Sequence, residues 1–237
     1  YAKIVKVDEK IFICKAIDCS KDQSYFLYQL SSQILESVEL PLGDILKKDI
    51  RKIAQENNLI NASKKDSTGI CFIGDRKYNN FVSQFLKSDI GKIVTVDGEE
   101  IGTHNGHMYF TVGQRKGLGI GARQSAFDQP WYVVNKDIDN NIVYVAQGPD
   151  HPALFSDELI ADNMHWNLDI QKNIPFKCNA KVRYRDIDHP CSILSSQDGQ
   201  CYIKFDHKIK AITPGQSIVL YHENGVCIGG GIIRKRN

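Results

Sequence analysis

Cys71 has the surroundings of a reactive thiol. It lies in the stretch Asn61 to Asp75, whose many Ser, Lys, Asp and Gly residues predict an exposed loop. The nearby cations Lys64, Lys65 and Arg76 would favour the thiolate, which is the form of cysteine that attacks and that accepts sulfur. On the residues alone, an inert structural cysteine remains the alternative, because free cysteines are often simply buried.

The other six cysteines suggest less chemistry. Five lie in apparent strands, where a small apolar side chain is the ordinary interpretation, and Cys19 ends a strand-like run. The five are Cys14, Cys178, Cys191, Cys201 and Cys227. The spacings Cys14-x4-Cys19 and His104-x2-His107 lack the second half of a standard zinc-ligand set, so no metal site is expected. An odd number of cysteines in a chain of this size favours a reducing, cytoplasmic compartment over a disulfide framework.

Three polar segments have groups that suit contacts with nucleic acid. Gly113 to Gly121 is glycine-rich and contains an Arg-Lys pair, but it matches neither common nucleotide-binding loop; it could approach an RNA backbone or simply shape a loop. Lys21-Asp22-Gln23-Ser24 could cap a helix or read a base edge. Arg183-Tyr184, in an exposed-looking strand, could stack on unpaired bases or simply be part of an ordinary amphipathic strand. The net charge of +2 gives no argument from bulk charge.

Apolar periodicity predicts three helices in the first part of the chain. Residues 22 to 38 follow a period near 3.6 after Asp22, a good helix cap, and predict helix, perhaps in two pieces. Residues 47 to 57 predict a short amphipathic helix that stops at Asn57-Asn58. Residues 77 to 86 place apolar side chains at i, i+3, i+4, i+7 and i+8, which predicts a third helix. The Cys71 loop lies between the second and third helices.

Beyond residue 91 the pattern changes to short β-rich runs separated by turn signals. These turn signals are Asp97-Gly98, Asp139-Asn140-Asn141, Asp198-Gly199 and Asn224-Gly225. The stretch Gly148 to Pro152 separates a hairpin from about six later strands, which predict a small closed barrel. The expected class is α+β, with a helical segment at residues 1–75, a central α+β domain at 76–150 and a six-stranded β-barrel at 151–237.

Seven segments together carry a resemblance to a known family. They are Lys21 to Leu27, Pro41 to Gly43, Asp66 to Gly74, Gly113 to Gly121, Pro130 to Val133, Thr213 to Gln216 and Gly229 to Ile233. In this order they resemble the bacterial and organellar tRNA-specific 2-thiouridylases over nearly the whole chain. The pair Asp66 to Gly74 and Gly113 to Gly121 is the most specific part of the match.

The resemblance implies a tRNA-uridine 2-sulfurtransferase. That family replaces the C2 oxygen of the wobble uridine with sulfur in tRNAs for Lys, Glu and Gln, after ATP, with Mg expected, has adenylated the oxygen. Cys71 matches the cysteine that receives sulfur as a persulfide, and a second cysteine in an upstream domain forms a disulfide with it during the cycle. The implied sulfur donor is a protein such as a cysteine desulfurase or a relay.

By the same resemblance, six residues would contact tRNA. They are Lys21, Asp22 and Gln23 in the first segment and Arg183, Tyr184 and Gln216 in the final barrel. Their expected role is grip and orientation rather than chemistry.

The family's ATP loop, SGGxDS, and its second cysteine do not occur in this sequence. The chain also begins at Tyr1, so we expect residues 1–75 to be the tail of a missing α/β PP-loop domain and the chain alone to be unable to activate uridine. A non-catalytic RNA-binding module and a persulfide carrier without RNA binding remain alternatives. The longest apolar runs are far shorter than the roughly 20 residues that span a bilayer, so no membrane partner is expected.

Overall fold

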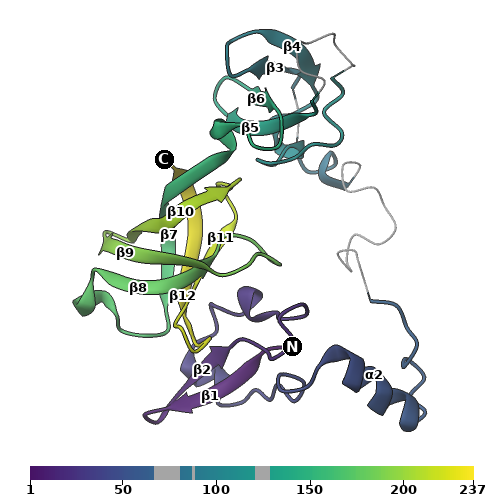
Figure 1. The fold of residues 1–237 in the computed structure, drawn as a ribbon, viewed down its shortest axis with the longest axis vertical. Helices are drawn as coiled ribbons and strands as arrows, with labels where there is room; N and C mark the ends of the chain where they lie inside the picture. The colour runs from purple at the N-terminus through teal and green to yellow at the C-terminus, as the bar shows by residue number, and fades with distance from the viewer. Residues whose placement is uncertain (67–80, 87–88, 121–128) are drawn as a thin grey trace. The chain divides into compact units, whose positions relative to one another are not determined.

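The computed structural model describes residues 1–66, 81–86, 89–120 and 129–237, which form two compact units (Figure 1). The barrel unit contains residues 1–65, 157–209 and 213–237, and the central unit contains residues 66–156 and 210–212. Cys71 and most of the helix expected at 77–86 lie outside the described residues. Of that helix, residues 81–86 show helical-turn hydrogen bonds, from the Phe85 and Leu86 amides to the Val82 carbonyl.

A closed barrel of six strands, in the order β10-β7-β12-β11-β8-β9, organises the barrel unit (Figure 1). The strands are β7 (Phe155–Trp166), β8 (Phe176–Lys181), β9 (His189–Gln197), β10 (Gln200–Lys210), β11 (Ser217–Tyr221) and β12 (Cys227–Arg236). In β10, Cys201, Ile203 and Phe205 are buried at alternate positions, as a strand with one face on a core requires. The expected six-stranded barrel is confirmed.

The turns of the barrel follow the sequence signals. Asp198 and Gly199 both have positive φ between β9 and β10, and Gly225 has positive φ between β11 and β12. Asn, Asp and Gly tolerate this left-handed region, which the tight connection of antiparallel strands needs. Both predicted turns are therefore confirmed.

An N-terminal hairpin packs beside the barrel within the same unit. Its strands are β1 (Lys3–Val7) and β2 (Lys10–Cys14), which pair antiparallel. The backbones of Cys14 and Val226 form an isolated antiparallel β-bridge, and the Lys15 amide donates to the Gly225 carbonyl at 3.0 Å. The end of the hairpin is therefore hydrogen-bonded to the turn between β11 and β12.

Residues 22 to 38 are helical only in two short pieces. These are the 3₁₀ turn η1 (Ser24–Phe26) and the helix α1 (Ser32–Leu35). The rings of Tyr25 and Tyr28 belong to a buried cluster that includes barrel residues such as Tyr221, so tertiary packing overrides the helical period. Asp22 is not the cap, because Gln23 precedes η1 and makes no side-chain capping bond.

The helix α2 (Lys47–Glu56) confirms the second expected helix. Its start is bonded from outside the helix, since the Asp18 carboxylate accepts from the Lys47 amide at 2.9 Å. It ends as predicted, with Asn58 at a φ of 53°. None of its residues is buried.

The central unit contains a four-stranded sheet in the order β4-β3-β6-β5. Its strands are β3 (Gly91–Thr95), β4 (Glu100–His104), β5 (Trp131–Asp137) and β6 (Ile142–Gln147), and two 3₁₀ turns are η2 (His107–Tyr109) and η3 (Pro152–Leu154). The strands β3 and β6 pair in parallel. The predicted turns at Asp97-Gly98 and Asp139-Asn140-Asn141 join β3 to β4 and β5 to β6. Ile93, Val133, Val143 and Val145 form the core of the sheet.

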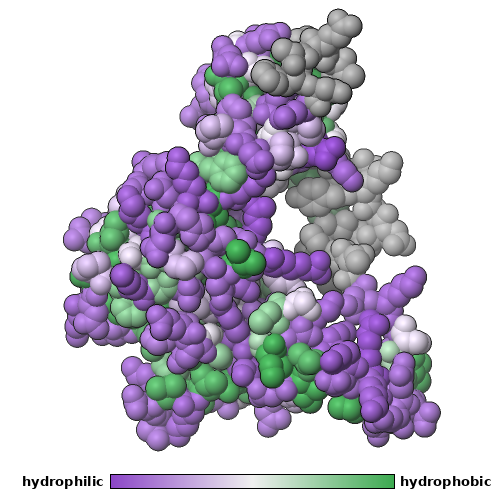
Figure 2. Space-filling view, in the orientation of Figure 1, coloured by the Kyte–Doolittle hydropathy of each residue, from purple (hydrophilic) through white to green (hydrophobic). Residues whose placement is uncertain are grey.

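The surface over the barrel strands is mainly hydrophilic on the face drawn in Figure 2, with separate hydrophobic side chains among the polar ones. A search of the described residues finds no helix with the length and apolarity that crossing a membrane requires.

Candidate nucleic-acid interface

A hollow of about 580 Å³ in the barrel unit gathers aromatic and polar side chains from separate parts of the sequence. We call it the aromatic pocket. It is lined by Tyr25, Phe26, Tyr28 and Gln29 from the N-terminal segment, by Arg183 and Tyr184 after β8, and by Gln216, Ser217 and Ile232 at β11 and β12. Since Ser217 pairs with Ile232 in the barrel register, the two strands form one continuous wall.

The inner part of the aromatic pocket is fixed by two buried tyrosines. The Tyr25 hydroxyl donates to the Ser217 carbonyl at 2.8 Å, and the Tyr28 hydroxyl lies 3.4 Å from the Ser217 hydroxyl. Burial raises the pKa of Tyr25 to about 12, so the phenol stays protonated at neutral pH and keeps its hydrogen bond. Gly230 provides the space for Tyr28, because a Cβ at Gly230 would lie 2.8 Å from the Tyr28 ring.

The outer part of the aromatic pocket presents an open ring. Phe26 is 60% exposed, and its ring centroid lies 4.5 Å from that of Tyr184. The Arg185 guanidinium lies 5.5 Å from the centroid of the Tyr184 ring. Exposed aromatic rings stack on unpaired bases, and arginines beside them can neutralise phosphates.

The structure brings together three of the sequence-predicted contact residues, Arg183, Tyr184 and Gln216, all of which line the aromatic pocket. The strand predicted for Arg183-Tyr184 is wrong, because β8 ends at Lys181 and both residues lie in the turn that follows. Because Arg183 and Tyr184 lie beyond the end of β8, their side chains face the pocket and do not alternate between the two faces of the sheet.

The other predicted contacts lie in the segment just before η1. Lys21 is half-buried and Gln23 is exposed, and neither lines the aromatic pocket. Asp22 is buried, with 1% of its side chain exposed. The remaining predicted site residue, Cys71, lies outside the described residues.

Asp22 is the centre of a buried polar cluster. Its carboxylate accepts from the Ala16 amide at 3.1 Å, the Ser24 amide at 3.2 Å and the Ser24 hydroxyl at 2.8 Å. Lys181 adds an ion pair at 3.6 Å. The Ser24 hydroxyl also lies 3.0 Å from the hydroxyl of the fully buried Tyr221.

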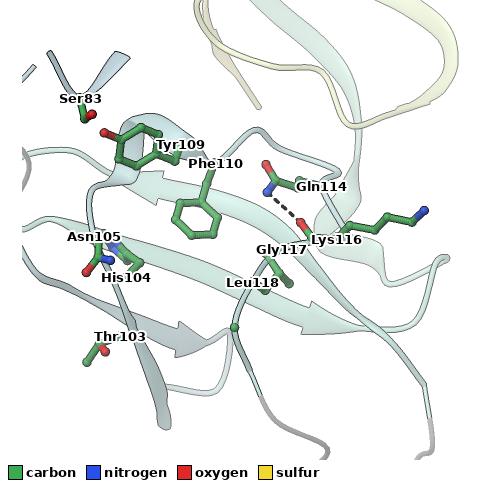
Figure 3. A pocket seen from close by; sticks show the side chains of 11 residues that line it. Ser83, Thr103, His104, Asn105, Tyr109, Phe110, Gln114, Lys116, Gly117 and Leu118 are labelled. Carbon is green, nitrogen blue, oxygen red and sulfur yellow. Dashed lines mark hydrogen bonds between the residues drawn. The ribbon is translucent and has the colours of Figure 1, made fainter. Parts of the chain in front are cut away.

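A second hollow, of about 680 Å³, lies in the central unit (Figure 3). We call it the central pocket. It is lined by Gln114, Lys116, Gly117, Leu118 and Gly119 of the glycine-rich segment, together with Ser83, Thr103, His104, Asn105, Tyr109 and Phe110. The segment is fixed to β5, because the Gly113 amide donates to the Val133 carbonyl and the Val133 amide donates to the Gln114 carbonyl.

The side chain of Gln114 is engaged by its own loop. The Gln114 side chain accepts from the Thr111 amide and donates to the Lys116 carbonyl, both at 3.0 Å. The Lys116 side chain extends away from the Phe110 ring (Figure 3). Burial lowers the pKa of His104, which therefore favours the neutral imidazole, and its Nδ1 accepts from the Gly106 amide. The geometry supports the interpretation of this segment as a shaped loop.

The five cysteines expected in strands are buried there, as predicted. Burial raises the pKa of Cys201 and of Cys227 to about 12, and the pKa of Cys191 is raised by its contact with the Cys178 thiol, 3.6 Å away, and by burial. Cys19 does not end a strand; it lies exposed in a turn beyond β2. Of the described thiols, only Cys19 is open to reagents.

Phe26 and Tyr25 were not singled out in the sequence. The helical period places Phe26 on an apolar face, whereas the short η1 leaves its ring exposed. The available signal was the segment Lys21 to Leu27, in which two adjacent aromatic residues directly follow a polar run. Only the packing of Tyr25 on the barrel shows which ring is buried.

The described first segment contains no glycine-rich phosphate-binding loop. Gly43 is the one glycine in residues 1–66, and a Cβ there would overlap the Ala2 backbone, so this glycine serves close packing. A phosphate cradle needs several free backbone amides on a glycine-rich loop. Among the described residues, no group of three His, Cys, Asp or Glu side chains could hold a metal ion.

Comparison with known proteins gives one consistent family. Residues 1–75 match the model of the tRNA methyl transferase HUP domain, residues 79–147 that of the tRNA methyl transferase PRC-barrel domain, and residues 156–233 that of the aminomethyltransferase beta-barrel domain. The tRNA-specific 2-thiouridylase MnmA of Klebsiella pneumoniae subsp. pneumoniae is 50% identical over 236 residues, and those of Shigella boydii serotype 4 and Escherichia coli O139:H28 are 48% identical over 236 residues. Each match covers 100% of this chain and 64% of the relative.

Proposed function

Because the chain belongs to the tRNA-specific 2-thiouridylase family, we propose that it serves the replacement of the C2 oxygen of a wobble uridine by sulfur. The acceptors are tRNAs for Lys, Glu and Gln. The aromatic pocket carries the proposal, since it joins three residues that match family tRNA contacts to an open ring. The proposal has three domains. Residues 1–75 would carry the persulfide-cysteine loop, residues 76–150 would form the central α+β domain, and residues 151–237 would form the tRNA-binding barrel.

The aromatic pocket suits a single-stranded segment of RNA. The base would stack on Phe26 and Tyr184, Arg183 would neutralise phosphate, and Gln216 would offer an amide to a base or sugar. Lys21 and Gln23 would extend the contact from the preceding segment. An anticodon loop is already unpaired, so its bases can enter a pocket at modest cost.

Cys71 would accept the sulfur. Its thiolate attacks the outer sulfur of a donor persulfide, the donor thiolate leaves, and Cys71 keeps the sulfur as its own persulfide without net oxidation or reduction. The donor is a cysteine desulfurase or a relay protein. The family's route then needs uridine activated by ATP with Mg, for which residues 1–66 offer no phosphate cradle. A reducing cytoplasm suits the free cysteines.

The proposed RNA binding is tested by measuring the affinity of the chain for a fluorescent tRNA with uridine at the first anticodon position. Replacing a stacking ring costs about 1–3 kcal/mol per base, so Phe26→Leu and Tyr184→Leu should each weaken binding about fivefold or more. Tyr109→Leu, in the central pocket, is the matched control and should leave binding within about twofold. Equal losses in all three variants would exclude the aromatic pocket as the site.

The proposed transfer of sulfur to Cys71 is tested by incubating the chain with a cysteine desulfurase and cysteine, followed by mass spectrometry of its peptides. We expect added sulfur on Cys71, none in a Cys71→Ser variant, and unchanged loading in a Cys19→Ser variant. Loading of Cys19 alone would contradict the assignment. Binding without loading would favour a non-catalytic RNA-binding module, and loading without binding would favour a persulfide carrier.

A further inference from the structure

The aromatic pocket depends on two segments that are far apart in the sequence. Arg183 and Tyr184 lie in the loop of residues 182–188 between β8 and β9, while Lys21 and Gln23 directly precede η1. If both segments contact one RNA, their spacing must be fixed before binding, because ordering them afterwards would weaken the complex. The contacts that fix this spacing are therefore part of the binding site.

Asp22 makes the first of these contacts. Its carboxylate is almost completely buried, and it is already bonded to the Ala16 amide, to Ser24 and to Lys181. Lys181 is the last residue of β8, and its side chain is only 10% exposed. The pair therefore ties the start of the 182–188 loop to the segment of Lys21 and Gln23.

A second ion pair ties the other end of the loop. Asp188 bonds to the Lys15 ammonium, which also lies 3.9 Å from the centroid of the Tyr221 ring. Tyr221 in turn contacts the Ser24 hydroxyl, which bonds to Asp22. One continuous network thus runs from Lys181 through Asp22, Ser24, Tyr221 and Lys15 to Asp188.

We propose that Asp22 is a positioning residue of the RNA site: it holds the Arg183–Tyr184 loop against the Lys21–Gln23 segment and does not itself contact the RNA. The inference rests on the proposed tRNA binding. The carboxylate has no open face for a base, and a negative charge directed at RNA would repel phosphate. Lys21 and Gln23, which flank it, are half-buried and exposed, respectively.

The physics of a buried pair provides a specific test. Removing one partner leaves an uncompensated buried charge, whereas replacing both with groups of similar size is often neutral. Asp22→Asn should therefore weaken tRNA binding about fivefold and lower the unfolding midpoint, and Lys181→Met should do the same. The double variant Asp22→Asn with Lys181→Met should recover both, with affinity within about twofold of the original chain.

Glu36→Gln is the matched control, because it removes one exposed carboxylate from the same N-terminal region. It should change neither the midpoint nor the affinity beyond the small gain that a lost negative charge gives. Affinity is measured by fluorescence polarisation of the labelled tRNA, and the midpoint by thermal unfolding of the same full chains.

Three results would overturn the inference. The double variant could recover its midpoint but not its affinity, which would mean that Asp22 or Lys181 contacts RNA directly. The single variant could bind as tightly as the original chain. The midpoint changes could be additive, which would mean that the two residues are not coupled. If the original chain does not bind tRNA, the proposed function fails instead, and the midpoints still report on the coupling without RNA.

Discussion

The aromatic pocket and the central pocket are similar in size, about 580 and 680 Å³, but they differ in what they leave open. The aromatic pocket has an exposed Phe26 ring and Arg183 in its lining. In the central pocket, Gln114 is engaged within its own loop and the Lys116 side chain extends away from the Phe110 ring (Figure 3). The two pockets therefore differ in the exposed aromatic surface that they offer to a base.

The same distinction applies to the thiols. All six described cysteines lie in the barrel unit, and five of them are buried in strands. Burial keeps these five thiols away from reagents in solvent, which makes most cysteines of this unit poor candidates for sulfur chemistry. Cys71, which the sequence predicts to be the reactive thiol, lies outside the described residues.

The largest expected effect is on thiol alkylation. With native protein and iodoacetamide, Cys19 should react on the order of 100-fold faster than Cys178, Cys191, Cys201 or Cys227, because buried thiols react only after local opening. Cys71 should react at least as fast as Cys19 if its loop is exposed. Peptide mass spectrometry over time measures each rate. Rapid labelling of Cys201 in folded protein would contradict the closed barrel interior.

The next effect concerns stability. Gly230→Ala should destabilise the barrel unit by about 1–3 kcal/mol, because the new Cβ would lie 2.5 Å from the Ile218 carbonyl oxygen and 2.8 Å from the Tyr28 ring. Gly102→Ala is the control in the central sheet, where the nearest atom outside the adjacent residues, on Ile93, lies 3.9 Å from the new Cβ. It should be neutral or slightly stabilising. Urea unfolding followed by tyrosine and tryptophan fluorescence measures both, and equal losses would refute the packing argument.

A smaller effect separates the two pockets by charge. Arg183→Glu should weaken tRNA binding about tenfold and reduce the slope of log affinity against log salt by about 1, as expected for one lost phosphate contact. Lys116→Glu makes the same charge change in the central unit and should leave the slope nearly unchanged. Titrations at several salt concentrations test the pair. If Lys116→Glu has the larger effect, the central loop is the RNA contact.

The smallest effect is on pH dependence. Burial lowers the pKa of His104 below 6.5, so the unfolded chain binds more protons there than the folded chain does. The stability that neutral His104 contributes is therefore present above pH 6.5 and is lost as pH falls below it. His104→Asn keeps an acceptor for the Gly106 amide but cannot titrate, and should show a flatter midpoint between about pH 7.5 and 5.5. An unchanged pH profile would show that His104 is not protected from protonation.

Local signals predicted much of the fold. The turns at Asp198-Gly199 and Asn224-Gly225, the helix α2 and the alternation of the barrel strands all depend on neighbours in the sequence. Residues 22 to 38 were harder to interpret, because Tyr25 and Tyr28 pack on β11 and β12 rather than along a helix. No local pattern reports a contact with a strand that lies so far along the chain.

The candidate site was predicted in part. Arg183, Tyr184 and Gln216 all line the aromatic pocket, although the strand assigned to the first two was wrong, and their contacts with tRNA stay a prediction. Phe26 was missed, since its exposure depends on where η1 stops. The role of Cys71 stays a prediction, because residues 67–80 are not described.

The way the aromatic pocket is assembled limits how the protein can be divided. The strands of the barrel close on themselves, yet Tyr25, Phe26 and Tyr28 come from the first part of the chain. A barrel transplanted into another protein would therefore keep a closed sheet but bring only half of the pocket, including Arg183, Tyr184 and Gln216. The closed sheet and the aromatic pocket of this chain therefore have different boundaries, and any exchange of parts between relatives that is meant to keep the pocket must move both segments together.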